Sequence, residues 1–266
     1  MTSPTRRTSP DAARHRLAEL HARLEHTGTM VTEPVRIPGS DVDVSVTRPA
    51  DIDTLLDQIA GDPEQNLPYW SEIWPSGVAL AGDIIQHPER IRGKRVLELG
   101  SGVGITAAIA TAQGARLTAT DYAPESLLLT RMTTLAHIGR EPDEVRRVNW
   151  RSSDIHELRN GGAFDVILGA DLLYERRDIE PLLAAVETLL DPSGALWLAE
   201  PGRKPAEIFL DGLEARGWRA ETRTWEGPWP DPEDDNVIVR THWLSRPVDA
   251  ILDNSDDPVQ KSPSRS

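Results

Sequence analysis

The amino-acid sequence predicts an α/β fold, built on a mostly parallel seven-stranded sheet with an antiparallel last strand and with helices on both faces. From residue 94 onward, short apolar segments of strand length alternate with segments of helical periodicity, which is typical of a parallel sheet covered on both faces. The last two predicted strands, 218–224 and 237–243, have no helix between them. Antiparallel neighbours need no crossover helix, so these strands are expected to form an antiparallel hairpin at one edge.

The amino-terminal part of the chain lies outside this alternating pattern. A helix is predicted to begin at Ser9-Pro10-Asp11, because Pro is favoured at the first helical position, and to end before Gly28. Two strands, 30–37 and 42–47, flank the turn 38–41 and predict a hairpin. We expect this helix and hairpin to cover the active-site edge of the sheet.

The remaining elements follow from the spacing of apolar residues. A short helix is predicted over 53–59, an apolar helix over 77–85, and a buried strand over 96–99 that turns sharply into a helix near Val103. The later helices are predicted at 124–137, 178–190 and 205–215, and the other strands at 115–120, 144–150, 164–169 and 195–199. The whole pattern is Rossmann-like.

Composition excludes several kinds of chemistry. The 266 residues include no cysteine, which excludes disulfides, a cysteine-based zinc site and a thiol nucleophile. The seven histidines show no metal-ligand spacing, so no metal is expected. A net charge of −14 argues against a general binder of nucleic acid. Neither a membrane-spanning segment nor a secretory signal is recognisable. A cytoplasmic location is expected, in keeping with the absence of cysteine.

The stretch K-R-V-L-E-L-G-S-G-V-G (94–104) organises the candidate site together with Asp121. Glycines at 100 and 102 let the backbone take positive φ and let a ligand approach without a Cβ in the way. The helix that follows offers unpaired N–H groups at its N-terminus. Asp121 ends the next strand, where its carboxylate can accept hydrogen bonds from both hydroxyls of a ribose. These features predict a site for a nucleoside-bearing cofactor.

Two classes of cofactor use such a loop. A nicotinamide dinucleotide fingerprint requires a small residue where this chain has Ile105. Glu98 stands just before the first glycine, where its carboxylate would repel a pyrophosphate and attract a cationic amino-acid end. S-adenosylmethionine carries such an end together with a sulfonium, so it is the predicted cofactor. A nicotinamide-dependent reductase and a glycine-rich turn without a ligand are the disfavoured alternatives.

Aromatic residues gather in two segments. Two tryptophans and a tyrosine occur within Tyr69–Trp74, ahead of the glycine loop. Because tryptophan faces attract cations, this segment can form an aromatic wall over the cofactor, or it can be a hydrophobic plug under the sheet. Trp225 and Trp229 lie in a proline-rich loop between the last two strands, which can lie over the substrate or form a rigid hairpin tip. The sequence leaves both pairs of alternatives open.

Four segments together resemble the class I, seven-β-strand S-adenosylmethionine-dependent methyltransferases. They are P-Y-W-S-E-I-W-P-S-G (68–77), V-L-E-L-G-S-G-V-G (96–104), V-N-W (148–150) and F-D-V-I-L-G-A-D-L-L-Y (164–174). The glycine loop marks only the superfamily. The first and fourth segments resemble the branch of protein lysine methyltransferases that includes those acting on electron-transfer flavoprotein β subunit and valosin-containing protein. Bacterial members of this branch are often described as nicotinamide-N-methyltransferase-like.

By this resemblance, a set of residues matches positions that line the cofactor site, and Glu98 would face the methionine amino end. The set is Trp74, Gly100, Ser101, Gly102, Asp121, Trp150 and Ala170. Asp121 and Trp150 are also expected to end successive strands at the edge where open α/β sheets bind ligands. Trp150 can then cover the adenine or simply pack at the strand end, and Asp154 is an alternative partner for the adenine amino group.

The same resemblance places the substrate amine at the catalytic candidates Asp171 and Tyr174, which match a D-x-x-Y/F motif after the fourth strand. In methyl transfer the protein aligns and desolvates the attacking nitrogen, and an amine with a pKa of about 10.4 must first lose its proton. Asp171 can accept a hydrogen bond from that nitrogen while Tyr174 packs beside it. The alternative role for Asp171 is to cap the helix that follows.

The sequence therefore predicts an S-adenosylmethionine-dependent N-methyltransferase that acts on a lysine side chain of a partner protein. A small-molecule N-methyltransferase acting on a nicotinamide-like ring or a metabolite amine, and a non-catalytic scaffold that keeps the fold, are the alternatives. No nucleic-acid or membrane partner is expected, and the acidic surface would favour a basic target. Four segments are expected: a tail and helix (1–29), a hairpin extension (30–66), the methyltransferase domain (67–247) and a disordered tail (248–266).

Overall fold

The computed structural model describes residues 8–52, 55–56 and 67–247. The disordered tail expected over 248–266 and most of the short helix expected over 53–59 lie outside the described residues. No helix in the described part is both long and apolar enough to span a bilayer.

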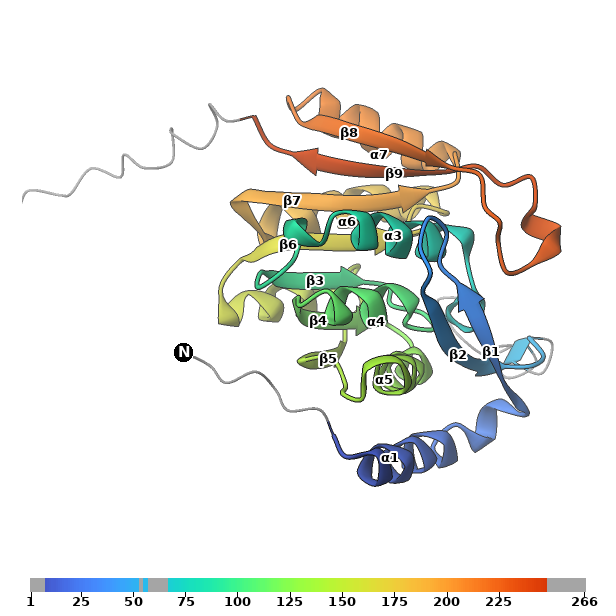
Figure 1. Ribbon diagram of the computed structural model, residues 1–266. Helices are drawn as coiled ribbons and strands as arrows, with labels where there is room; N and C mark the ends of the chain where they lie inside the picture. The colour runs from blue at the N-terminus through green and yellow to red at the C-terminus, as the bar shows by residue number, and fades with distance from the viewer. Residues whose placement is uncertain (1–7, 53–54, 57–66, 248–266) are drawn as a thin grey trace, which may run out of the picture.

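The centre of the molecule is a seven-stranded sheet with the strand order β5-β4-β3-β6-β7-β9-β8 (Figure 1). Neighbouring strands are parallel except at β9, which lies antiparallel to both β7 and β8. The predicted α/β fold with an antiparallel last strand is confirmed, with β8 at the edge and β9 inside it. The strands are β3 (Arg95–Leu99), β4 (Arg116–Asp121), β5 (Glu144–Arg147), β6 (Phe164–Ala170), β7 (Leu190–Glu200), β8 (Arg219–Trp225) and β9 (Val239–Ser245).

One predicted strand is shorter in the structure. The strand expected over 144–150 ends at Arg147, because Asn149 closes a turn. The side-chain oxygen of Asn149 accepts a hydrogen bond from the Arg151 N–H at 2.9 Å, and its carbonyl accepts one from the Ser152 N–H at 2.9 Å. Trp150 therefore lies in the turn after β5 and not at the end of the strand.

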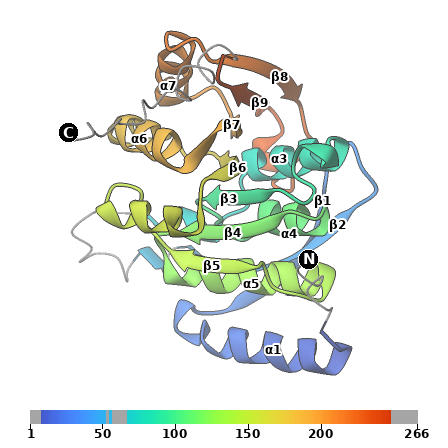
Figure 2. The same ribbon diagram turned by 90° about the vertical axis from the view of Figure 1, so that its left-hand side faces the viewer.

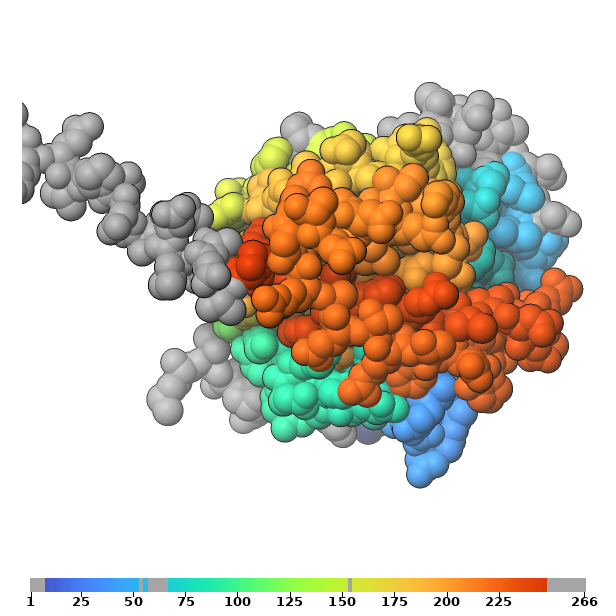
Figure 3. Space-filling view, turned by 90° about the horizontal axis from the view of Figure 1, so that it is seen from above, coloured from blue at the N-terminus to red at the C-terminus, as the bar shows by residue number. Residues whose placement is uncertain are grey.

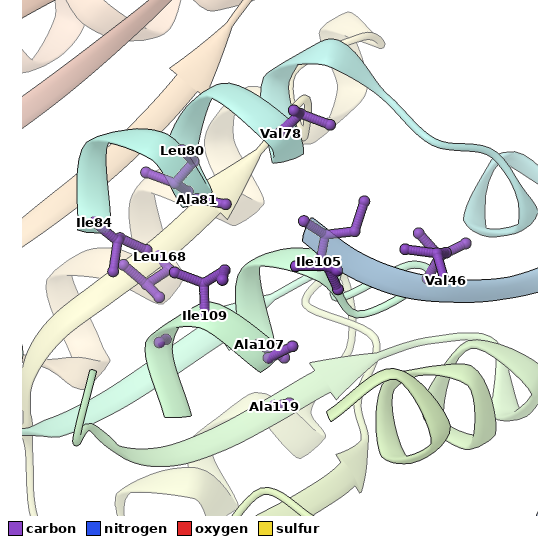
Figure 4. Packing of buried hydrophobic residues seen from close by; sticks show 14 of the residues in the cluster. Val46, Val78, Leu80, Ala81, Ile84, Ile105, Ala107, Ile109, Ala119 and Leu168 are labelled. Atoms are coloured by element: carbon purple, nitrogen blue, oxygen red, sulfur yellow. The ribbon is translucent and has the colours of Figure 1, made fainter. Parts of the chain in front are cut away.

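Helices cover both faces of the sheet (Figure 2). One face carries α3 (Pro75–Gln86), α4 (Ile105–Ala112) and α5 (Pro124–Ile138), and the other carries α6 (Ile179–Leu189) and α7 (Lys204–Glu214). Each face has its own buried apolar cluster, because each layer of helices packs its apolar side on the sheet. In the first cluster, Ile109 of α4 lies close to Ile84 of α3 and Leu168 of β6 (Figure 4).

An amino-terminal layer is formed by α1 (Pro10–Ala22) and the hairpin of β1 (Met30–Arg36) and β2 (Asp43–Pro49). The Ser9 hydroxyl accepts a hydrogen bond from the Ala12 N–H at 3.3 Å and so caps α1, as the Ser-Pro start predicts.

This layer packs on helices more than on the active-site edge. Both α1 and β2 contact α5, and the hairpin residues Val35 and Val46 belong to the buried cluster on that face. The carboxyl end of β2 reaches the loop that precedes α3, where Arg48 Nη1 lies 3.4 Å from Glu72 Oε2. The expectation that the helix and hairpin cover the active-site edge therefore holds in part, where β2 meets Glu72 and α4.

Candidate active site

The glycine loop between β3 and α4 has the backbone that its sequence predicts. Gly100, Gly102 and Gly104 have φ values of +66°, +50° and +84°, which L side chains rarely adopt. A Cβ on Gly100 would lie 2.6 Å from Leu172 Cδ2, whereas one on Gly104 would lie 2.5 Å from Thr130 Cα. The first glycine thus lets Leu172 pack closely on the loop, and the third lets α4 begin in close contact with α5.

Asp121 ties this loop to the end of β4. Its Oδ2 accepts a hydrogen bond from the Gly102 N–H at 3.0 Å, and its Oδ1 accepts one from the Ala123 N–H at 3.0 Å. Burial raises the pKa of Asp121, and these backbone hydrogen bonds oppose that rise. The structure therefore places Asp121 where it was predicted, at the loop and at the carboxyl end of a strand.

Glu98 is the least satisfied polar group of the site. Its side chain is 3% exposed, and its Oε2 has no hydrogen-bond partner among the described residues. Burial and the nearby Asp121 carboxylate raise the pKa of Glu98 well above its usual value. Glu98 lines a small cavity of about 50 Å³ that is also bordered by five other predicted cofactor residues, Trp74, Gly100, Ser101, Gly102 and Ala170.

An unpartnered buried carboxylate is stabilised by a cation, and the glycine loop leaves room for a ligand beside it. The α-ammonium of the methionine portion of S-adenosylmethionine is such a cation. The residues present therefore fit this cofactor, with Glu98 at its amino end and the glycine loop beside it. The same residues do not fit a pyrophosphate, which Glu98 would repel.

A second cavity of about 450 Å³ adjoins this one and has aromatic walls. Trp74 lines both cavities, and Tyr69 and Tyr174 line the second. The ring of Tyr69 meets Trp74 and Tyr174 edge-on, with centroids 5.7 and 5.4 Å apart. Trp70 packs instead against the apolar cluster under the sheet. Trp70 thus packs on the core, as one alternative predicted, while Tyr69 and Trp74 line the second cavity; an aromatic wall over the cofactor stays a prediction.

Asp171 lies at the floor of the second cavity. It is 9% exposed and is the one non-glycine residue of the described chain with a positive φ, +52°. Its N–H donates to the Ala199 carbonyl at 2.9 Å, which holds it beside the end of β7. The helix that follows, α6, begins at Ile179, so the alternative role of Asp171 as its cap is wrong.

Arg203 holds the Asp171 carboxylate, and sequence reasoning missed it. The Arg203 Nε donates to Asp171 Oδ1 at 2.8 Å and its Nη2 donates to Oδ2 at 3.2 Å. The guanidinium also lies 5.9 Å from the centroid of the Trp74 ring. Arg203 follows the carboxyl end of β7, and a charged residue at that edge of a parallel sheet was the signal that could have found it.

Tyr174 lines the same cavity. Burial raises the pKa of Tyr174 to about 12, so its phenol stays protonated near neutral pH. The structure therefore brings Asp171 and Tyr174 together at one cavity, as predicted.

Trp150 lies between the glycine loop and the second apolar cluster. A Cβ on Gly100 would lie 3.7 Å from the Trp150 ring, and the Trp150 Nε1 donates to Asp178 Oδ1 at 3.4 Å. Asp178 is itself fully buried and paired with Arg151 at 2.6 Å. Trp150 thus packs beside the loop, and its contact with adenine stays a prediction. The side chain of Asp154 lies outside the described part of the chain.

The fold, the glycine loop and the cavity at Glu98 define this chain as a class I, seven-stranded α/β protein of the methyltransferase type. It belongs to the lysine methyltransferase family, whose model matches residues 64–215.

Relatives with curated names are similar over part of their length. The chain is 30% identical over 145 residues to EEF1A lysine methyltransferase 3 of Mus musculus, covering 54% of this chain and 61% of that one. It is 31% identical over 174 residues to the electron transfer flavoprotein beta subunit lysine methyltransferase of Rattus norvegicus, covering 65% and 64%. It is 30% identical over 143 residues to histone-arginine methyltransferase METTL23 of Xenopus laevis, covering 50% and 57%. The chain therefore spans between 57% and 64% of the length of these three relatives.

A solved structure agrees with the fold. A Pyrococcus horikoshii protein proposed to be an RNA methyltransferase superposes with a TM-score of 0.52 at 16% identity, covering 73% of this chain and 96% of that one. At this level of identity the likeness shows the fold alone.

Proposed function

We propose that this chain transfers a methyl group from S-adenosylmethionine to a lysine ε-amine of another protein. The observation that carries the proposal is the pair of adjoining cavities. One holds the unpartnered Glu98 carboxylate, the other holds Asp171 among aromatic rings, and Trp74 lines both. One cavity would thus take the cationic amino-acid end of the cofactor and the other the acceptor amine, with Trp74 lining both.

The cofactor, when bound, supplies a methyl group that is already activated by a positive sulfur, so the chain needs no nucleophile of its own. Glu98 would hold the amino end of the cofactor by charge. The N–H groups at the start of α4 would face its polar groups, and Asp121 would accept hydrogen bonds from the ribose. The work left to the chain is to orient the acceptor nitrogen and to exclude water from it.

The acceptor cavity is built for that work. Aromatic walls at Tyr69, Trp74 and Tyr174 remove water from an incoming amine, and desolvation lowers the pKa of an amine and favours its neutral, nucleophilic form. Asp171 would accept a hydrogen bond from the nitrogen and direct it, while sharing its oxygens with Arg203. Tyr174 would act by packing, because a phenol with a pKa of about 12 is a poor proton acceptor near neutral pH.

An arginine acceptor is the second candidate. The Arg203 guanidinium already lies over the Trp74 ring and against the Asp171 carboxylate, so this cavity accommodates a planar guanidinium. One relative is a histone-arginine methyltransferase, whereas the family model and two relatives are named for lysine. The names of the family and of these relatives favour a lysine acceptor, and the geometry of the cavity allows either a lysine amine or an arginine guanidinium.

The test is transfer of label from methyl-tritiated S-adenosylmethionine into a lysate separated into protein and small-molecule fractions. We expect label in the protein fraction, released by acid hydrolysis as methyl-lysine. Release as methyl-arginine would support the second candidate. Label confined to the small-molecule fraction would support a metabolite methyltransferase, and no transfer despite cofactor binding would favour a scaffold.

A further inference from the structure

We propose that a groove beside Asp171 docks an extended, basic segment that flanks the acceptor residue of a protein substrate, an inference that rests on the proposed function. The groove has a volume of about 600 Å³ and lies between the start of α3, the start of α7 and the segment that joins β8 to β9. It shares Trp74, Asp171 and Arg203 with the acceptor cavity. A chain that enters the acceptor cavity with one side chain can therefore continue into the groove.

One wall of the groove belongs to an acidic segment, of whose carboxylates Asp234 lines the groove itself. The segment from 226 to 238 contains five carboxylates and no lysine or arginine. Asp234 lines the groove, and none of the five takes part in a salt bridge within the described residues. The carboxylates are Glu226, Asp231, Glu233, Asp234 and Asp235.

The basic residues of the groove are already neutralised. Arg203 is paired with Asp171 at 2.8 Å, and Arg240 Nη1 lies 3.6 Å from Glu200 Oε1. Burial and the neighbouring carboxylates of Asp231 and Glu233 raise the pKa of Asp234, which is the direction expected where negative charge is uncompensated. A segment carrying arginine or lysine would supply the missing countercharge.

Two further features indicate a ligand rather than a merely solvated acidic loop. Ser76 is fully buried, lines the groove, and its Oγ has no hydrogen-bond partner among the described residues. Ile238 lines the groove with 48% of its surface exposed, the largest value among the exposed large apolar side chains of the described chain. A bound peptide would supply a partner for each residue. Its backbone can form a hydrogen bond with the Ser76 hydroxyl, and the aliphatic parts of its side chains can cover Ile238.

The acidic wall is fixed in place by two tryptophans. Trp229 is buried, and its Nε1 donates to the Val237 carbonyl at 2.8 Å across the loop. Trp225 donates to Thr241 Oγ1 at 3.1 Å, and a Cβ on Gly82 of α3 would lie 3.0 Å from its ring. The loop extends from the end of the sheet beside the hairpin (Figures 1 and 3). A wall held in this way needs little ordering when a partner binds.

The test is binding of a fluorescein-labelled peptide with a central lysine and arginines at alternate flanking positions, measured by anisotropy with S-adenosylhomocysteine present. The groove variant is Glu233→Gln, Asp234→Asn and Asp235→Asn combined, which leaves the Asp231 side chain to accept from the Glu233 N–H. The matched control is Glu25→Gln, Glu89→Gln and Glu214→Gln, exposed residues away from the groove, which changes the net charge equally. We expect the groove variant to bind the peptide about tenfold more weakly than the wild type, and the control variant to bind within about twofold.

A second peptide with glutamine in place of each arginine should bind weakly to all three proteins. Equal affinity of the groove and control variants, or equal binding of the two peptides by the wild type, would overturn the groove assignment. Because anisotropy needs no turnover, this result is separate from the fate of the proposed function. If the peptide binds in a groove-dependent way but no methyl transfer occurs, the proposed enzymatic activity is wrong and the docking groove still stands.

Discussion

Arg203 donates two hydrogen bonds to the Asp171 carboxylate, 2.8 Å from Nε to Oδ1 and 3.2 Å from Nη2 to Oδ2. The pair joins the loop after β7 to the loop after β6 at the floor of the acceptor cavity. Because a forked guanidinium fixes both oxygens of a carboxylate, Arg203 sets the direction in which Asp171 can accept a further hydrogen bond.

Replacing Arg203 with alanine should therefore lower methyl transfer about tenfold, a modest value because the guanidinium is partly exposed. The loss should appear in kcat, since Asp171 would keep its charge and lose its orientation. Arg203→Lys should restore only part of the rate, because lysine lacks the fork. Arg219→Ala, at an exposed position of β8 outside both cavities and the groove, is the control and should keep wild-type kinetics. Equal rates for Arg203→Ala and wild type would show that orientation by Arg203 is unnecessary.

Two substitutions at Asp171 can separate the effect of losing its carboxylate from the effect of its strained backbone. Both Asp171→Gly and Asp171→Ala remove the carboxylate, but only alanine keeps a Cβ at a φ of +52°. We expect both variants to lose methyl transfer to a similar degree, with the alanine variant less stable by about 1 kcal/mol. Turnover and thermal unfolding of the two variants give the answer. A glycine variant that retained full turnover would remove Asp171 from the mechanism.

The raised pKa of Glu98 predicts how the affinity for the cofactor depends on pH. Burial and the Asp121 carboxylate raise the pKa of Glu98 in the free protein, and only the ionised form attracts an ammonium group. Affinity for S-adenosylhomocysteine should therefore fall as the pH is lowered through this raised pKa, and binding should release protons. Calorimetry in two buffers of different ionisation enthalpy counts these protons. Glu98→Gln should bind more weakly and without proton release; unchanged release would assign the protons to another group.

The same shift has a consequence for folding. The folded pKa of Glu98 lies above the unfolded value, so the folded state binds more protons and its stability falls as the pH rises above about 4.3. The Glu98→Gln variant lacks this loss. The free energy of unfolding of this variant, measured in denaturant without ligand, should increase relative to that of the wild type as the pH rises. A constant difference between the two proteins would contradict the assignment.

Tyr174 is expected to act through its ring. The phenol has a pKa of about 12, and the ring meets Tyr69 at a centroid distance of 5.4 Å. Tyr174→Phe should thus keep methyl transfer within about threefold and leave its pH profile unchanged, whereas Tyr174→Ala should open the cavity to water and lower kcat. Complete loss of activity in the phenylalanine variant would instead assign a role to the hydroxyl.

The closing glycine of the loop carries a stability prediction. Gly104→Ala would place a Cβ 2.5 Å from Thr130 Cα at a φ of +84°, while Gly93→Ala has φ +73° and nothing within 4 Å. The Gly93 variant should lose about 1 kcal/mol from backbone strain alone. The Gly104 variant should lose about 2 kcal/mol more, because α4 must move off α5. Denaturant unfolding of the two variants measures the difference, and similar losses would mean that the contact between the helices is loose.

The elements that sequence alone located are those with strong local signals. A short stretch of sequence is enough to recognise the glycine loop by its backbone freedom and the preceding strand by its apolar residues. The same holds for Asp121, which ends the next strand. The antiparallel final hairpin followed from the missing crossover, although its placement with β9 inside β8 depends on pairing with β7. Trp150 was misplaced because the turn at Asn149 ends β5 early.

The parts of the site that escaped sequence reasoning arise from contacts between distant segments. Arg203 meets Asp171 only because β6 and β7 are neighbours in the sheet, and the groove exists only where the β8–β9 loop meets α3 and α7. Asp171, with its positive φ, likewise bonds to Ala199 on the next strand. The segment boundaries at 29, 66 and 247 and the cytoplasmic location stay predictions.

The central claim is that the glycine loop and Glu98 bind S-adenosylmethionine. Its most direct test is calorimetric titration of the full chain with S-adenosylhomocysteine, with NADH as the comparison ligand and with folded Gly102→Arg and Glu98→Gln variants alongside. The account predicts single-site binding of S-adenosylhomocysteine that is abolished in Gly102→Arg, weakened in Glu98→Gln, and absent for NADH. Binding of NADH, or S-adenosylhomocysteine binding that both variants retain in full, would contradict it.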